Sequence, residues 1–252
     1  MKIGEDIKAV WVATVPRTGS MWTFNVLRDL VRATGRPVQP EIVPHADEEM
    51  EAIGQVGIAD RSEAIYVLKV HTRIAADLAR SCFVVTRRDL RDSIVSFMRF
   101  TKTDFDAGLR FLAGAVRLER HFATFPPERT IVIDYAEIIA RPEAVITELG
   151  RRLSLDVSPA LVAELVQRFS KDSVQARLVE REQALREKIG ARQPVDVREF
   201  VHSGDRSLRA FDVTTGFQSG HVSAYREGDW RHILTPEQQQ AVEALIAAER
   251  AK

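Results

Sequence analysis

A short motif with a cation, a glycine and small hydroxyls stands near the start of the chain: Pro16-Arg17-Thr18-Gly19-Ser20-Met21-Trp22. It follows the apolar run 9–15 and precedes a helical pattern that begins near Thr23. A tight turn between a strand and a helix presents several free backbone N–H groups, and such groups bind phosphate oxygens. Residues 16–22 are therefore a candidate phosphate cradle.

The motif differs from the Walker A loop of ATP-binding proteins. That loop requires Gly, four residues and then Gly-Lys-Ser/Thr, a spacing that occurs nowhere in this chain. Taken alone, the motif is equally compatible with an ordinary strand-to-helix turn in which Ser20 is the N-cap and Trp22 lies in the core. Residues elsewhere in the chain must decide between the two interpretations.

A second group of polar residues, 87–96, follows the apolar run 82–86 directly. Arg88 leaves the end of this predicted strand, and Ser96 lies about two turns into the helix that follows. Both can face one anionic group at the carboxyl edge of a parallel sheet, and Arg supplies a fixed fork for phosphate oxygens. The alternative is a solvated cluster of ion pairs within 87–92.

Lys69 and His71 form a third candidate pair, at the end of the predicted strand 64–70. Alternation along a strand places both side chains on the same side. A lysine can neutralise developing negative charge, and a histidine can take a proton near neutral pH. An unspecialised surface pair is the alternative for these two residues.

The fourth candidate is the segment 225–231, just before the last predicted helix. Gly228 permits close approach of the backbone, Arg226 offers charge, and Trp230 can anchor the segment. Taken alone, this segment is a turn before a helix.

Composition restricts the class of protein. The chain has 252 residues, of which 45% are hydrophobic and 29% charged, which suits one α/β domain over 1–252. Lys and Arg number 36, and so do Asp and Glu, so no global field attracts nucleic acid or an anionic membrane. The apolar stretch near the N-terminus is too short for a secretion signal or membrane insertion, and we expect a cytoplasmic protein. Cys82 stands in an apolar run and is expected to be a buried, inert thiol.

Short apolar runs alternate with helical patterns along the first half of the chain. The runs 9–15, 64–70, 82–86 and 130–134 predict strands of a buried parallel sheet. Helices are predicted over 23–34, 90–100, 104–125, 142–153, 159–169, 173–189 and 236–251. Residues 193–226 show no period and predict a long loop, either functional or without a role. The pattern predicts a central parallel sheet flanked by helices, with a mostly helical C-terminal third.

The order and spacing of these pieces resemble the sulfotransferases that use 3′-phosphoadenosine 5′-phosphosulfate (PAPS). Residues 16–22 resemble the loop of that family for the 5′-phosphosulfate, and residues 88–96 resemble its motif for the 3′-phosphate. Lys69-Val70-His71 matches the Lys-x-His of the family. Residues 132–142 are similar to its strand and Pro-led helix, and 227–231 to its Gly-Asp-Trp segment. The resemblance covers most of the chain and implies a P-loop NTPase-like α/β fold.

The resemblance also implies a reaction, the in-line transfer of a sulfuryl group from PAPS to a hydroxyl, or less often an amine, of a small-molecule acceptor. Adenosine 3′,5′-bisphosphate (PAP) is then the product, and no metal takes part. His71 is the expected general base, and Lys69 and Arg17 stabilise charge. The expected cofactor-binding residues are Arg17, Thr18, Gly19, Ser20, Met21, Trp22, Arg88, Ser96, Arg226 and Gly228, with Trp22 stacking on adenine.

The sequence departs from the family at three points. Arg17 stands where many members have Lys, which keeps the charge and favours charge stabilisation over proton transfer. Residues 223–225 replace the basic Arg-Lys-Gly before the Gly-Asp-Trp segment, and Arg226 or His221 is expected to substitute for it. The Leu-Pro common after the Lys-x-His is missing after His71.

Two other functions stay open at this stage. One is a small-molecule kinase on a P-loop-type fold, which the missing Walker A lysine disfavours. The other is a nucleotide-binding protein without catalysis. The acceptor should be met by 37–58, 101–111 and 173–222, which carry no pattern that names it, and a homodimer is left open. The charge-dense segment 180–192 is expected to be a solvated helix face with pairs such as Glu182 with Arg186.

Overall fold

A five-stranded, entirely parallel sheet forms the centre of the computed structural model, which describes residues 1–203, 207–222 and 226–252. The strands run in the order β2-β3-β1-β4-β5. They are β1 (Ala9–Ala13), β2 (Val38–Gln39), β3 (Ile65–Val70), β4 (Ser81–Arg87) and β5 (Thr130–Asp134). The predicted parallel sheet is confirmed, and only β2, with two residues too short to form a pattern, was not predicted.

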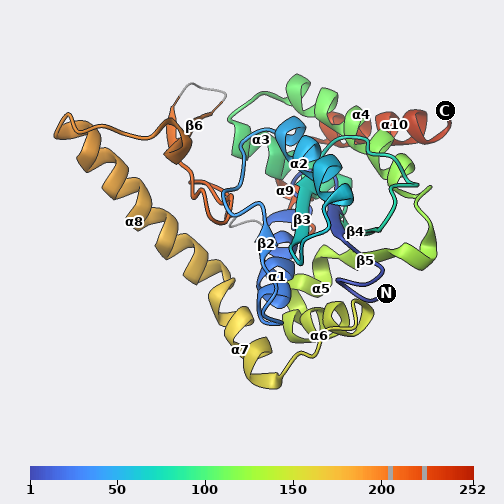
Figure 1. The fold of residues 1–252 in the computed structure, drawn as a ribbon. Coiled ribbons are helices and arrows are strands. Elements are labelled where there is room, and N and C mark those ends of the chain that lie inside the picture. Colours follow the sequence, from blue (N-terminus) through green and yellow to red (C-terminus); the bar gives the residue numbers. More distant parts are fainter. Residues whose placement is uncertain (204–206, 223–225) are drawn as a thin grey trace.

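Helices cover both faces of this sheet, which explains why its strands are almost continuously apolar. Trp11 and Phe83 are paired in register on β1 and β4, so their side chains point to the same face. Trp11 lies under α2 (Asp47–Ala59), and Phe83 contacts Phe125 just after α4 (Phe105–Phe122). Figure 1 shows α1 (Ser20–Arg32) and α6 (Pro142–Arg152) on the opposite side of the sheet.

The remaining helices are α3 (Leu90–Thr101), α5 (Tyr135–Ala140), α7 (Pro159–Arg168), α8 (Lys171–Gly190), α9 (Trp230–Ile233) and α10 (Pro236–Arg250), with the 3₁₀ helices η1 (Pro127–Arg129) and η2 (Val197–Glu199). All seven predicted helices are confirmed, with ends that move by at most a few residues. Capping explains the accuracy, since Asp89 and Asp104 accept backbone N–H groups at the starts of α3 and α4, and Pro236 opens α10.

Helix α2 was not predicted because two glycines and a cluster of acids weaken its helical pattern. The structure shows why these two positions have glycine. A Cβ on Gly54 would overlap the side chains of Trp11 and Leu68, and a Cβ on Gly57 would overlap the ring of Tyr66. The glycines therefore let α2 lie close to the sheet, and close packing outweighs their low helix propensity.

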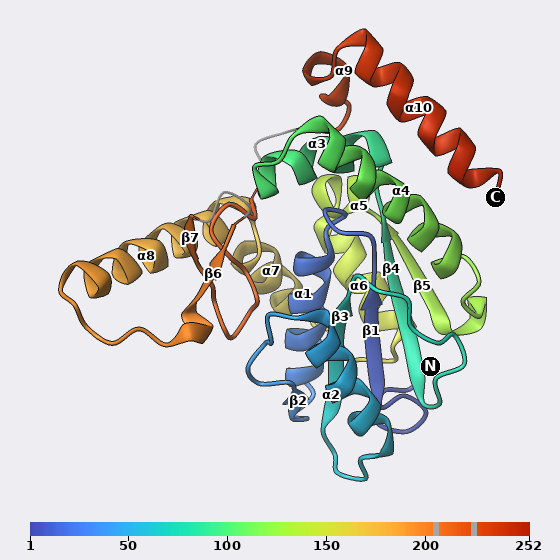
Figure 2. The ribbon, with the colours of Figure 1, turned by 90° about the horizontal axis from the view of Figure 1, so that it is seen from above.

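The stretch 193–226, predicted as an unpatterned loop, holds a small antiparallel hairpin of β6 (Phe200–His202) and β7 (Leu208–Ala210). The prediction was wrong there because three-residue strands are too short to show an alternating pattern. Figure 2 shows the hairpin beside α8, on the side of the molecule away from α9 and α10. The rest of the C-terminal third is helical, as predicted.

Three smaller expectations concern single groups and the surface. Cys82 is fully buried, and burial raises the pKa of its thiol to about 12, which makes the thiol inert at neutral pH. Arg186 and Glu182 form the predicted ion pair on α8, with 2.6 Å between nitrogen and oxygen. Among the described residues, no helix is both long enough and apolar enough to span a membrane.

We expect Gly54→Ala to destabilise the protein, because the new methyl group has to displace Trp11 or Leu68 in a packed core. Overpacking of this kind costs about 1–3 kcal/mol of the free energy of unfolding. Gly114→Ala on α4 is the matched control, since its Cβ meets no atom within 4 Å. That control should stabilise the protein by up to about 1 kcal/mol. Urea unfolding measures both, and equal effects would contradict the close packing of α2.

Candidate functional site

The loop between β1 and α1 has the conformation of an anion cradle. Arg17 and Gly19 both adopt the left-handed backbone conformation, with φ angles of 72° and 96°. Gly19 is the N-cap of α1 and provides no side-chain cap, so Ser20 is the first helical residue and not the cap. The first-turn N–H groups of α1 therefore have no partner within the helix, and no acidic residue stands in that turn.

Two contacts hold the cradle in place. The hydroxyl of Thr18 donates to the carbonyl of Val15 at 2.7 Å and lies 2.6 Å from the hydroxyl of Thr86 on β4. Thr18 is fully buried, and its hydroxyl ties the loop to the sheet. Gly19 approaches Ile138 and Tyr135 so closely that a Cβ would lie 2.9 Å from Ile138.

A cavity of about 730 Å³ opens beside the cradle, at the carboxyl edge of the sheet. It brings together nine of the predicted site residues: Arg17, Gly19, Ser20, Met21, Trp22, Lys69, His71, Arg88 and Ser96. Thr18, Arg226 and Gly228 are not among the described residues that line it. Residues predicted from three separate motifs thus line one cavity, and their roles stay predictions.

The guanidinium of Arg17 forms part of the cavity wall. Its Nε donates to the hydroxyl of Ser96 at 3.1 Å, and its Nη2 donates to the carbonyl of His221 at 3.1 Å. The group also lies 4.3 Å from the ring centre of Phe100. Burial, and then the charge of Arg88, lower the pKa of Arg17 to about 10, so it stays positive at neutral pH. No carboxylate neutralises it in these contacts.

Arg88 is more than nine-tenths buried, which rules out the solvated ion-pair interpretation for this residue. Its Nη1 donates to the carbonyl of Arg17 at 3.1 Å, and its guanidinium lies over the ring of Tyr135 at 4.4 Å. Its Nε is buried and has no hydrogen-bond partner within the described part of the chain. The neighbouring Arg91 does form the surface pair, with Asp89 at 2.6 Å. A buried cation with a free donor can bind an anion.

His71 is held in a defined tautomer. Its Nδ1 lies 2.8 Å from the carbonyl oxygen of Thr14, which can only accept, so Nδ1 carries the proton. Its Nε2 then carries the lone pair, which accepts a hydrogen bond from the Nζ of Lys69 at 3.3 Å. Burial, and then the charge of Lys69, lower the pKa of His71 to about 4. The ring is therefore neutral at pH 7 and can accept a proton at Nε2.

Asp47 is a site residue that the sequence analysis missed. Its Oδ2 accepts the backbone N–H of His71 at 2.7 Å, and its Oδ1 lies 3.7 Å from the Nζ of Lys69. Burial lowers the pKa of Lys69, and Asp47 opposes that shift by favouring the charged form. Asp47 stands at the start of α2, the helix that was not predicted, so the sequence offered no signal for it.

The C-terminal segment docks on the start of α3 rather than on the cavity. The N–H of Gly228 donates to Asp92 Oδ2 at 2.9 Å, and the N–H of Trp230 lies 3.4 Å from Asp92 Oδ1. The backbone N–H of Arg226 bonds Asp229 at 2.8 Å. Residues 223–225, the position of the basic tripeptide of the family, lie outside the described residues. Cofactor contacts by Arg226 and Gly228 stay predictions.

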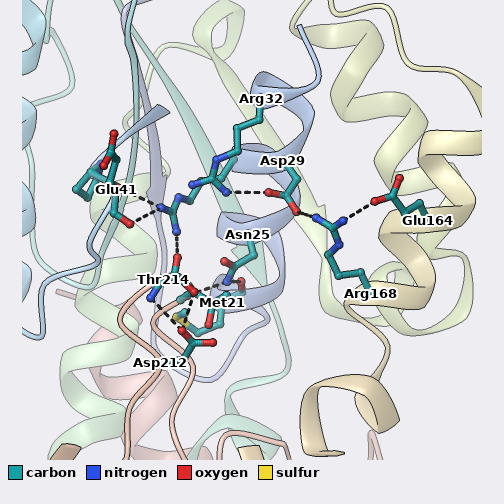
Figure 3. Close-up of polar contacts among 12 residues, drawn as sticks. Met21, Asn25, Asp29, Arg32, Glu41, Glu164, Arg168, Asp212 and Thr214 are labelled. Carbon is teal, nitrogen blue, oxygen red and sulfur yellow. Dashed lines mark hydrogen bonds and ion pairs between the residues drawn. The ribbon is translucent and has the colours of Figure 1, made fainter. Parts of the chain in front are cut away.

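Helix α1 also holds the opposite wall of the cavity. The Nδ2 of Asn25 donates to the carbonyl of Thr215 at 2.9 Å, and the buried Arg28 donates to the carbonyls of Thr214 and Pro40. Figure 3 shows Asn25 on the helix beside the loop that holds Asp212 and Thr214. The continuation of this loop, through Phe217 and His221, lines the cavity. One helix thus positions both the cradle and a second wall of the cavity.

Comparisons with known proteins agree with this architecture. Residues 68–159 match the model of the sulfotransferase family. The fold is similar to retinol dehydratase in complex with androsterone and inactive cofactor PAP (12% identity, 98% of this chain and 82% of that chain, TM-score 0.59). It is equally similar to a mouse sulfotransferase complexed with PAP (14% identity, 99% and 85%, TM-score 0.59). A search of curated proteins finds no match. At these identities the structures show a shared fold.

We expect the His71 ring to stay neutral down to about pH 5, because burial and Lys69 hold its pKa near 4. Removing the charge in Lys69→Met should raise this pKa toward the ordinary value for histidine. Titration by NMR of the ring carbon and nitrogen signals measures both effects. The ring of His121, which bonds the carbonyl of Ile74 outside the cavity, is the internal control. A wild-type His71 that protonates near pH 6.5 would contradict the geometry.

Proposed function

We propose that this protein, a member of the sulfotransferase family by the match over residues 68–159, transfers a sulfuryl group from PAPS to a hydroxyl of a small molecule. One observation carries the proposal. The cradle before α1, the cations Arg17 and Arg88, and the neutral His71 meet in a single cavity. That combination can bind a doubly phosphorylated nucleotide and deprotonate an acceptor beside it.

The donor set of the cavity fits PAPS. Arg17, the hydroxyl of Ser20 and the first-turn N–H groups of α1 would hold the 5′-phosphosulfate. Arg88, whose buried Nε lacks a partner among the described residues, and Ser96 would hold the 3′-phosphate. Trp22 would stack on the adenine. When bound, PAPS supplies a sulfuryl group attached to a phosphate leaving group.

The residues of the chain then have separate tasks. His71 takes the proton of the acceptor hydroxyl at Nε2, while Thr14 keeps the proton on Nδ1 and so maintains the tautomer. The acceptor oxygen forms the new bond to sulfur, and the electron pair of the broken bond stays on the leaving phosphate. Lys69 and Arg17 stabilise the negative charge on that phosphate. Asp47 holds Lys69 next to His71.

The walls of the cavity suit an acceptor with an apolar body. The segments expected to meet the acceptor do contribute lining residues, among them Val43, Thr101, Phe211 and Phe217. Phe97 and Phe100, from the last turns of α3, add two further rings. Retinol dehydratase, similar in fold, was crystallised in complex with androsterone and PAP and in complex with retinol and PAP. We propose a small apolar alcohol or phenol as the acceptor, met in these aromatic walls.

Calorimetric titration with PAP, adenosine 5′-phosphosulfate, AMP and ATP tests the proposed function. The protein should bind PAP more tightly than AMP, because only PAP carries the 3′-phosphate. Arg88→Ala should weaken the binding of PAP at least tenfold, since a hydrogen bond to a charged group contributes about 1.5–3 kcal/mol. The same substitution should weaken the binding of adenosine 5′-phosphosulfate little, because that nucleotide has no 3′-phosphate. Arg87→Ala, which removes an exposed arginine one position earlier, is the matched control.

Three outcomes of this titration count against the proposal. Equal affinity for PAP and AMP in the wild type would remove the proposed cofactor. Equal weakening of both probe nucleotides by Arg88→Ala would remove the assignment of the 3′-phosphate to that residue. A preference for ATP over PAP would favour a kinase.

We expect His71→Ala to reduce turnover by about 10²–10⁴-fold, the usual effect of losing a general base. His71→Asn, whose amide can still donate to the carbonyl of Thr14, should be as inactive, because it lacks a base at the Nε2 position. PAP affinity should stay within a few-fold of wild type in both variants. Turnover is measured as PAP released from PAPS with 4-nitrophenol and a panel of apolar alcohols. Activity close to wild type in His71→Asn would show that another group is the base.

A further inference from the structure

A second histidine, His221, lines the same cavity and has the opposite tautomer to His71. Its Nδ1 lies 2.9 Å from the backbone nitrogen of Gln218, which can only donate. The lone pair is therefore on Nδ1, and the neutral ring carries its proton on Nε2. His71 offers an acceptor at Nε2 and His221 offers a donor at Nε2, so the two rings are suited to different tasks.

The ring of His221 is fixed among the cations of the site. It stacks in parallel on Phe100, with 4.9 Å between ring centres, and meets Phe217 edge-on at 6.0 Å. Its carbonyl accepts from Arg17 at 3.1 Å. Burial, and then the charges of Arg17 and Lys69, hold the pKa of the ring well below its ordinary value. His221 therefore stays neutral and keeps its Nε2–H as a donor at neutral pH.

We propose that His221 is a further cofactor-binding residue, whose Nε2–H donates a hydrogen bond to an oxygen of the sulfuryl group during transfer. This inference rests on the proposed function. The carbonyl of His221 accepts from Arg17, the cation that we assign to the 5′-phosphosulfate, so we place His221 at that end of the cavity and not at the 3′-phosphate. A neutral donor stabilises the sulfuryl oxygens through a hydrogen bond and releases no proton itself.

The position of the donor depends on the loop that α1 anchors. The carbonyl of Thr215 accepts from Asn25, and the carbonyl of Thr214 accepts from the buried Arg28 (Figure 3). Gln218, the donor that sets the tautomer of His221, follows three residues later in the same loop. The helix that begins at the cradle thus also fixes the loop that supplies His221.

Two substitutions distinguish the effect of the Nε2–H donor of His221 from the effect of its aromatic ring. His221→Phe keeps a ring that can stack on Phe100 but removes the hydrogen bond. His221→Gln places an amide N–H near the position of Nε2 and cannot act as a base at neutral pH. Binding of PAPS, PAP and adenosine 5′-phosphosulfate is measured by calorimetry for both variants and the wild type. His221→Asn, whose amide is too short to reach the Nε2 position, replaces His221→Phe if the latter fails to fold.

In His221→Phe we expect about a tenfold loss of affinity for PAPS and for adenosine 5′-phosphosulfate, the size expected for one hydrogen bond to a charged group. Affinity for PAP, which has no sulfuryl group, should stay within about threefold of wild type by the same reasoning. His221→Gln should recover most of the lost affinity and, in the turnover assay, most of the lost rate.

Other results would overturn the inference. If His221→Phe lost equal affinity for PAP and PAPS but kept its affinity for adenosine 5′-phosphosulfate, His221 would lie at the 3′-phosphate. An inactive but tightly binding His221→Gln would make His221 a base. Unchanged affinity for all three nucleotides in His221→Phe would remove any contact with the bound group. In each case the wild type still binds PAP in preference to AMP, whereas failure of the proposed function abolishes that preference.

Discussion

Positive charge without matching negative charge is the constraint on which the site depends. Arg17 and Arg88 are enclosed at the carboxyl edge of the sheet, yet their hydrogen bonds and ring contacts are with hydroxyls, carbonyls and aromatic faces rather than carboxylates. Burying cations in this way is costly unless an anion completes the site. The rigid sheet and the tie between Thr18 and Thr86 keep the two guanidinium groups in place despite their mutual repulsion.

The same excess of positive charge sets the chemistry of the two histidines. Burial and nearby cations lower the pKa of both His71 and His221, so both rings are neutral at pH 7. Their different hydrogen bonds then decide what each ring offers. The carbonyl of Thr14 leaves the lone pair of His71 on Nε2, where it accepts from Lys69, whereas the N–H of Gln218 leaves His221 with a protonated Nε2. An acceptor and a donor thus arise from one residue type and one electrostatic field.

Helix α1 connects these parts mechanically. Its first turn provides the cradle, and its middle holds the loop of the opposite wall through Asn25 and Arg28. Buried Arg28 would be unfavourable in an apolar core, but carbonyl groups of two loops satisfy much of its hydrogen-bonding capacity. A ligand that binds at the helix N-terminus therefore meets a wall that the same helix has positioned.

The sequence by itself determined four of the five strands of the parallel sheet, seven helices and nine of the residues that line the cavity, because apolar runs, caps and the positions just after strands are local signals. Lys69, His71, Arg88 and Ser96 were found in this way. Only the tertiary structure brought Asp47 to Lys69, formed α2 around two glycines, and carried His221 to Arg17. These contacts join residues far apart in the chain. They depend on tertiary packing, which leaves no signal in any short stretch of the sequence. Tautomers and shifted pKa values likewise depend on burial and neighbouring charge, which exist only once the chain has folded.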